Sequence, residues 1–158
     1  MDRPATQSRF APRDPDWERR CRDGFARQQY MRFIGGELAA LAPGRCSVAV
    51  ALKPELTQQR GFLHGGVTAA LADTAAGFAA YSLMPAGSSP LTVEFKINLM
   101  APAVGERFVA SGQVVRAGRL LTIVDTEVAA EAGGQSKLIA KMLATLICME
   151  ATPDRAAE

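Results

Sequence analysis

A long apolar run near the middle of the chain constrains the fold more than any other feature. Asp73 is the only side chain with a fixed charge in residues 61–93, and the chain's single histidine, His64, precedes it by nine positions. Residues 66 to about 83 are apolar nearly all round, which predicts a helix inside the core and not on a surface. A buried carboxylate costs several kcal/mol unless it is hydrogen-bonded or paired, so Asp73 is predicted to have a use.

The overall composition excludes several classes of protein. A chain of 158 residues with 48% apolar and 22% charged residues fits one globular domain with a sizeable core. Its 18 basic and 16 acidic side chains are too balanced to indicate a nucleic-acid-binding protein. The apolar run is mostly alanine, glycine and threonine, whereas a membrane span needs about 20 mainly large apolar residues. We therefore expect neither a nucleic-acid partner nor a membrane-embedded segment.

The cysteines and the opening residues bear on metal binding and on location. Three widely spaced cysteines without a CxxC pair, together with one histidine, make no credible zinc site, so neither a metal nor another cofactor is expected. The first 20 residues are polar and charged and include four acids, unlike a secretory or transit segment. These features predict a cytoplasmic protein with reduced thiols.

The regions before the apolar run predict an arm, a helix and two strands. Residues 1–15 contain three prolines and no apolar period, which is typical of a mobile N-terminal arm. Asp16 is placed to cap a helix from residue 17 to about residue 33. Two short strands then flank the turn signal at Pro43-Gly44.

The regions after the apolar run predict four strands. Residues 91–99 alternate, with Thr92 among the polar residues on one face and the apolar residues on the other. Turn signals at 116–119 and 132–135 divide the remainder into three antiparallel strands. The element order predicts an α+β domain over residues 16–150, in which an antiparallel sheet wraps around the apolar helix, followed by a tail at 151–158.

The motif at the head of the apolar helix carries a family resemblance. "GFLHGGVTAALADTAAG" is followed, 18 residues after its acid, by "LTVEFKINLMAPAVGE", whose strand connection runs from Pro102 to Glu106 and includes Gly105. Over about residues 52–149 the chain resembles the PaaI-type acyl-CoA thioesterases of the hotdog superfamily. The resemblance implies a hotdog fold, a homodimer or homotetramer with active sites at the dimer interface, an acyl-CoA substrate and no metal.

The resemblance also assigns roles to individual residues. Asp73 falls on the catalytic acid, and Gly65 on the position whose backbone N–H holds the thioester oxygen, with His64 beside it. Thr92 falls where a small hydroxyl residue often assists the acid, and Gln58 stands where the family often has asparagine. Three further residues of the motif are expected to contact the substrate: Gly66, Phe62 and Leu63.

These residue types suit thioester hydrolysis. Unpaired N–H groups at a helix start lie at the positive end of the helix dipole and can stabilise a developing oxyanion by about 3 kcal/mol. Asp73 would activate water as a general base or attack directly, and the sequence leaves both routes open. Gly65 and Asp73 are eight residues apart on the predicted helix, about 12 Å, so one carbonyl cannot reach both. Two antiparallel helices in a dimer would bring the start of one to the acid of the other.

Two other functions are possible for a hotdog domain. A non-catalytic acyl-CoA-binding domain of the same fold, acting as a sensor or scaffold, has no need of a buried acid such as Asp73. A hotdog dehydratase arranges its histidine and acid differently. No G-x-S-x-G or phosphate-binding glycine motif is present for a serine hydrolase or a nucleotide-binding protein.

Overall fold

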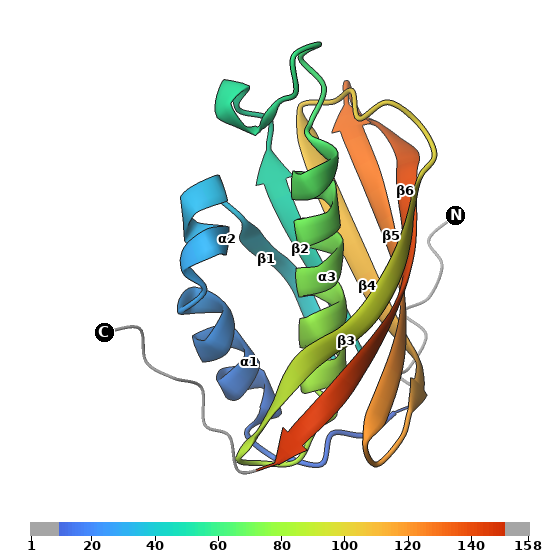
Figure 1. Ribbon diagram of the computed structural model, residues 1–158. Helices are drawn as coiled ribbons and strands as arrows, with labels where there is room; N and C mark the ends of the chain where they lie inside the picture. The colour runs from blue at the N-terminus through green and yellow to red at the C-terminus, as the bar shows by residue number, and fades with distance from the viewer. Residues whose placement is uncertain (1–9, 151–158) are drawn as a thin grey trace.

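The structure, a computed structural model, describes residues 10–150 and consists of one sheet curved around one long helix (Figure 1). All strand pairings are antiparallel, in the spatial order β1-β2-β4-β5-β6-β3. This confirms the predicted α+β architecture. In chain order the elements are α1 (Trp17–Ala26), α2 (Gln29–Ile34), β1 (Glu37–Ala42), β2 (Arg45–Ala51), the short 3-10 helix η1 (Pro54–Leu56), α3 (Gly65–Tyr81), β3 (Ser88–Leu99), β4 (Arg107–Ala117), β5 (Leu121–Ala132) and β6 (Gln135–Glu150).

Alanine in α3 allows the sheet to approach the helix closely. Ala72, Ala75, Ala76 and Ala79 are fully buried, as the apolar pattern predicts. A Cβ atom added at Gly112 of β4 would lie 2.8 Å from the carbonyl oxygen of Ala75, so strand backbone meets helix backbone there. Small side chains on both elements are therefore required for this packing, which explains why the core helix is rich in alanine and poor in leucine.

The predicted single helix over residues 17–33 is wrong, because the chain breaks at Gln28 into α1 and α2. Gln28 has an extended backbone, with ψ 103°, and the Arg32 guanidinium donates to the carbonyl of Ala26 at the end of α1. In an unbroken helix Met31 would point roughly 80° away from Cys21. The break lets both of these side chains be buried. Asp16 stands at the N-cap position of α1, but its carboxylate pairs with Arg19 and does not cap.

Residues 10–15, which were predicted to belong to a mobile arm, pack against the end of α3. Arg13 Nε donates to the carbonyl of Leu83, and the buried carboxylate of Asp14 lies 3.1 Å from the guanidinium of Arg20. Arg20 also donates to the carbonyls of Tyr81 and Met84. These contacts fix α1 against the C-terminal end of α3. The rest of the predicted arm, 1–9, and the predicted tail, 151–158, lie outside the described residues.

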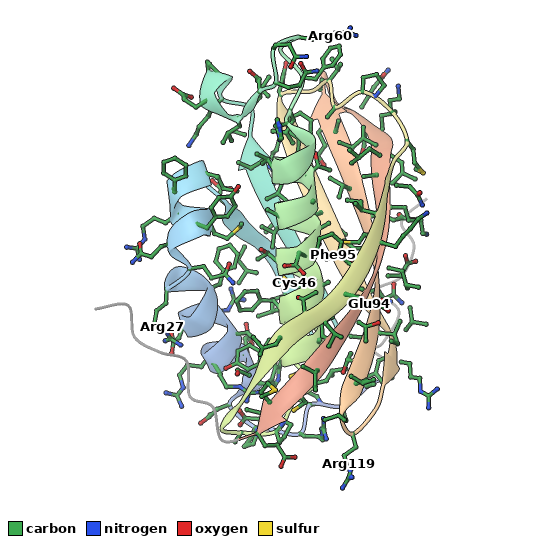
Figure 2. The ribbon with its side chains drawn as sticks, in the orientation of Figure 1. Arg27, Cys46, Arg60, Glu94, Phe95 and Arg119 are labelled. Atoms are coloured by element: carbon green, nitrogen blue, oxygen red, sulfur yellow. The ribbon has the colours of Figure 1, made fainter. Side chains whose placement is uncertain are left out.

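β3 is an edge strand of the sheet and is only partly covered. Apolar side chains at Leu91, Val93 and Leu99 are each more than half exposed, and Phe95 is 45% exposed (Phe95 is labelled in Figure 2). The pairing with β6 shows that the predicted alternation along this strand is interrupted. The register with β6 shifts between Thr92 and Glu94, so that Val93 is an extra residue in the strand.

Cys46 offers a test of core packing through pH. Burial, together with the nearby thiol of Cys21, raises the pKa of the Cys46 thiol from 9.0 to about 12. The unfolded chain loses this proton near pH 9 and the folded chain keeps it, so the free energy of unfolding falls as pH rises from 9 towards 12. Between pH 8.5 and 10 we expect wild type to lose about 1 kcal/mol more than Cys46→Ala, measured by urea unfolding in reductant. Parallel pH profiles for the two proteins would contradict this packing.

Candidate active site

Asp73 lies on α3 with its carboxylate directed toward β3. Thr92 Oγ1 donates to Asp73 Oδ1 at 2.8 Å, which joins two residues 19 positions apart in the sequence. Asp73 is half-buried and helps to line a cavity, and within residues 10–150 its second oxygen accepts no hydrogen bond from another residue. A half-buried carboxylate fixed by one hydroxyl can accept a proton from a bound water or attack an electrophile.

The bulge in β3 is what brings Thr92 to Asp73. Thr92 pairs with Leu146 of β6, and Phe95 pairs with Ala144; both β6 residues are buried on the concave face of the sheet. Cross-strand partners share a face, so Thr92 and Phe95 point to the same side although the alternating pattern placed them on opposite faces. Without the extra residue Val93, the Thr92 hydroxyl would turn away from α3.

The start of α3 has a distinctive hydrogen-bonding pattern. His64 is the N-cap residue, and its Nδ1 accepts from the backbone N–H of Gly66 at 2.9 Å, while its carbonyl accepts from Val67 and Thr68. The Gly65 N–H has no hydrogen-bond acceptor within residues 10–150. His64 therefore accepts a hydrogen bond from the Gly66 N–H and leaves the Gly65 N–H open, without an acceptor in the described chain. Because Nδ1 accepts, the ring proton of a neutral His64 lies on Nε2.

A side chain at either glycine of this turn would meet a close neighbour. A Cβ on Gly66 would lie 3.0 Å from His64 Nδ1, the atom that accepts its N–H. A Cβ on Gly65 would lie 2.9 Å from Leu99 Cδ1, the end of a flexible side chain. Gly66 thus permits the histidine cap, whereas a Cβ at Gly65 would have to displace only the flexible end of Leu99.

The loop before α3 has mainly structural contacts. Gln58 Oε1 accepts from the backbone N–H of Arg60, and the Gln58 backbone bonds to Phe62 and Gly61, so the predicted amide belongs to a tight turn. Phe62 is half-buried, and Leu63 is 3% exposed and belongs to the core. The Leu63 side chain therefore has little surface for the substrate contact predicted for it. Arg60, at the tip of this loop, projects away from the body of the molecule (Figure 2).

The predicted site residues thus form two groups within one chain. Asp73 and Thr92 meet beside the middle of α3, and His64, Gly65 and Gly66 lie at its start. Gly65 and Asp73 are eight helical residues apart, about 12 Å. One chain does not bring an open backbone amide and the acid to the same atom.

A cavity of about 380 Å³ opens beside Asp73 and Thr92. It runs along α3 as far as Tyr81, and its other walls come from β3 and from the junction of α1 and α2. The sequence pattern gave no reason to place Gln28 here, because the helix break that exposes it was not predicted. Gly77 was not predicted either, although its place four residues after Asp73 puts both residues on one face of the predicted helix. The lining residues are Gly24, Arg27, Gln28, Asp73, Thr74, Gly77, Phe78, Tyr81, Pro90, Leu91, Thr92 and Leu146.

Two further observations concern metal binding and membrane-spanning helices. Within residues 10–150, no group of three or more His, Cys, Asp or Glu side chains is arranged to hold a metal ion. No helix of the described chain has both the length and the apolar character to cross a membrane.

Comparison with known proteins places the chain in a family. Residues 60–137 match the model of the thioesterase superfamily. The human protein acyl-coenzyme A thioesterase 13 is 32% identical over 105 residues, which are 66% of this chain and 73% of that protein.

Solved structures agree with this assignment. A thioesterase family protein from Silicibacter pomeroyi has a TM-score of 0.83 at 42% identity, covering 85% of this chain and 98% of the other. The E. coli PaaI protein superposes with a TM-score of 0.78 at 19% identity, covering 87% and 96% of the two chains, and confirms the hotdog fold. The chain belongs to the thioesterase superfamily and is a thioester hydrolase.

Proposed function

We propose that the chain hydrolyses acyl-CoA thioesters in active sites that are each shared by two copies of the chain. The observation that carries this proposal is the division of functional groups along α3. Asp73 is held by Thr92 near the middle of the helix, whereas the Gly65 N–H is open at its start. A twofold axis that sets two α3 helices antiparallel would pair each open amide with the acid of the partner subunit.

The unpartnered edge of the sheet supports such a dimer. β3 has β6 on one side and no strand on the other within the described chain. Its exposed apolar residues Leu91, Val93 and Leu99 are costly to leave in water, and the backbone N–H and C=O groups of an edge strand readily pair with another chain. Pairing of two β3 edges would continue the sheet and bring the two α3 helices together on its concave face.

The division of labour in this site follows from the chemistry of the thioester. The carbonyl oxygen acquires negative charge as the tetrahedral species forms, and the Gly65 N–H at the positive end of the helix dipole stabilises that charge. His64 keeps the turn closed through Gly66 and so fixes where the Gly65 amide points. Asp73 either takes a proton from water or attacks the carbonyl to form an anhydride, with CoA thiolate leaving in both routes. Thr92 restricts the rotation of the Asp73 carboxylate.

Release of free CoA from a panel of aliphatic and aromatic acyl-CoAs tests the proposal. We expect wild type to release free thiol from at least one member, and each CoA released to be matched by one carboxylic acid. The competing function, a domain that only binds acyl-CoA, would return the bound thioester intact. Intact acyl-CoA throughout the panel, recovered from protein shown to be folded and dimeric, would exclude hydrolysis of these substrates.

A further inference from the structure

The cavity beside Asp73 has one wall that lies outside the part of the chain matched by the thioesterase model. That match begins at residue 60, whereas Gly24 and Gln28 line the cavity from the junction of α1 and α2. The junction is held in place from α1, where the guanidinium of Arg20 donates to the carbonyl of Tyr81 and lies 4.4 Å from the centre of the Tyr81 ring. The N-terminal helices therefore form a fixed wall of this cavity.

Gly77 provides open space on the opposite wall. It lies four residues after Asp73, on the same face of α3. A Cβ added there would meet only Leu146 Cδ2, at 3.9 Å, which is ordinary van der Waals contact. The glycine thus relieves no clash, although glycine is a poor residue for a helix interior. What it provides is room in the cavity, one helical turn from the carboxylate.

Gln28 provides an unused polar group in the same cavity. Its backbone N–H donates to Phe25, and its carbonyl accepts from Arg32, so the backbone of this residue is satisfied. Its half-buried side-chain amide makes no hydrogen bond with another residue of the described chain. Neither amide atom is among the buried polar atoms of the described chain that lack a partner, so both remain open to solvent in the cavity. The amide offers two donors and one acceptor to a group bound there.

We propose that this cavity holds the acyl group of the substrate, that Gly77 limits how bulky this group can be, and that Gln28 recognises a hydroxyl or carbonyl group on it. The inference rests on the proposed function, because it places the thioester at Asp73. Phe78 also lines the cavity and supplies apolar surface there. The acyl group that fits is compact and apolar near the thioester and carries a hydrogen-bonding substituent.

The first arm of the test varies the size of the cavity. We expect Gly77→Val to lower kcat/KM for phenylacetyl-CoA at least about tenfold while acetyl-CoA, which is too small to reach the new methyl groups, changes less than about twofold. Gly77→Ala should give an intermediate effect. Equal losses for the two substrates would show that the substitution perturbs the fold or the acid and would overturn the role of Gly77.

The second arm varies the polar group. Two substrate pairs differ by one hydroxyl: hexanoyl-CoA with 3-hydroxyhexanoyl-CoA, and phenylacetyl-CoA with 4-hydroxyphenylacetyl-CoA. In at least one pair we expect Gln28→Leu to lower the preference for the hydroxylated member about tenfold. Gln29→Leu, a change of the same kind at the exposed neighbouring residue, should leave both preferences as in wild type. Unchanged preferences in Gln28→Leu would overturn the recognition role.

Binding separates failure of this inference from failure of the proposed function. The same acyl-CoAs are titrated calorimetrically into proteins that carry Asp73→Asn, with and without the substitutions at Gly77 and Gln28. If affinities follow the cavity residues while wild type hydrolyses nothing, the acyl site stands and the thioesterase proposal fails. If wild type hydrolyses the panel but neither affinity nor kcat/KM depends on Gly77 or Gln28, the acyl group lies elsewhere and the inference fails.

Discussion

Replacing Asp73 with asparagine is expected to lower kcat/KM at least about a hundredfold for every acyl-CoA that wild type hydrolyses. Asparagine has nearly the same shape, and its carbonyl oxygen can still accept the hydrogen bond that Thr92 donates at 2.8 Å. It can neither take a proton from water at neutral pH nor attack a thioester. The loss therefore reports on the acid function of Asp73 and not on packing.

A surface aspartate provides the matched control for this experiment. Asp125 lies on β5 and pairs with Lys141 at 3.1 Å, away from the cavity beside α3. Asp125→Asn makes the same chemical change, and its exposed ion pair contributes little to stability, so kcat/KM should stay as in wild type. Free-thiol release measured on both variants compares the two positions directly. Full activity in Asp73→Asn would move the acid function to another residue.

The sequence supported the fold because its strongest signals are local. The apolar run around Asp73 forms α3, and the turns at Pro43-Gly44 and at the glycine pair 133–134 each separate two strands. The backbone at Gly44 is left-handed, a conformation that glycine adopts easily. The break at Gln28 had no such signal. It arises because Met31 and Cys21 both turn into a core that only the folded chain creates.

The candidate site was predictable in part for the same reason. The spacing between the start of the predicted helix at Gly65 and Asp73 predicted both groups of the candidate site and their separation. The contact between Asp73 and Thr92 depends on the bulge at Val93, which is set by pairing with β6 and leaves no trace in the alternating pattern. The cavity wall at Gln28 depends on how α1 docks on α3, a tertiary arrangement that periodicity does not encode.

Removal of a single backbone N–H tests the other half of the proposed site. Gly65 is the first residue of α3, a position that favours proline, and His64 before it already has the extended backbone that a following proline requires. Gly65→Pro therefore removes the N–H with little cost to the helix. Gly65→Ala is the matched control, since it adds a Cβ near the same Leu99 methyl but keeps the N–H. We expect kcat of the proline variant to be about 100- to 1,000-fold below that of the alanine variant.

The two inactive variants together decide whether each site is shared by two chains. In a hybrid dimer of Asp73→Asn with Gly65→Pro, one interface site combines an intact Gly65 amide from the first chain with an intact Asp73 from the second. The other site lacks both groups. Hybrids purified through two different tags should therefore regain about half of the wild-type activity per dimer, although each parent homodimer is nearly inactive. If the amide and the acid served one thioester within a single chain, each chain of the hybrid would lack one of them. The hybrid would then be as inactive as its parents, and the shared site would be excluded.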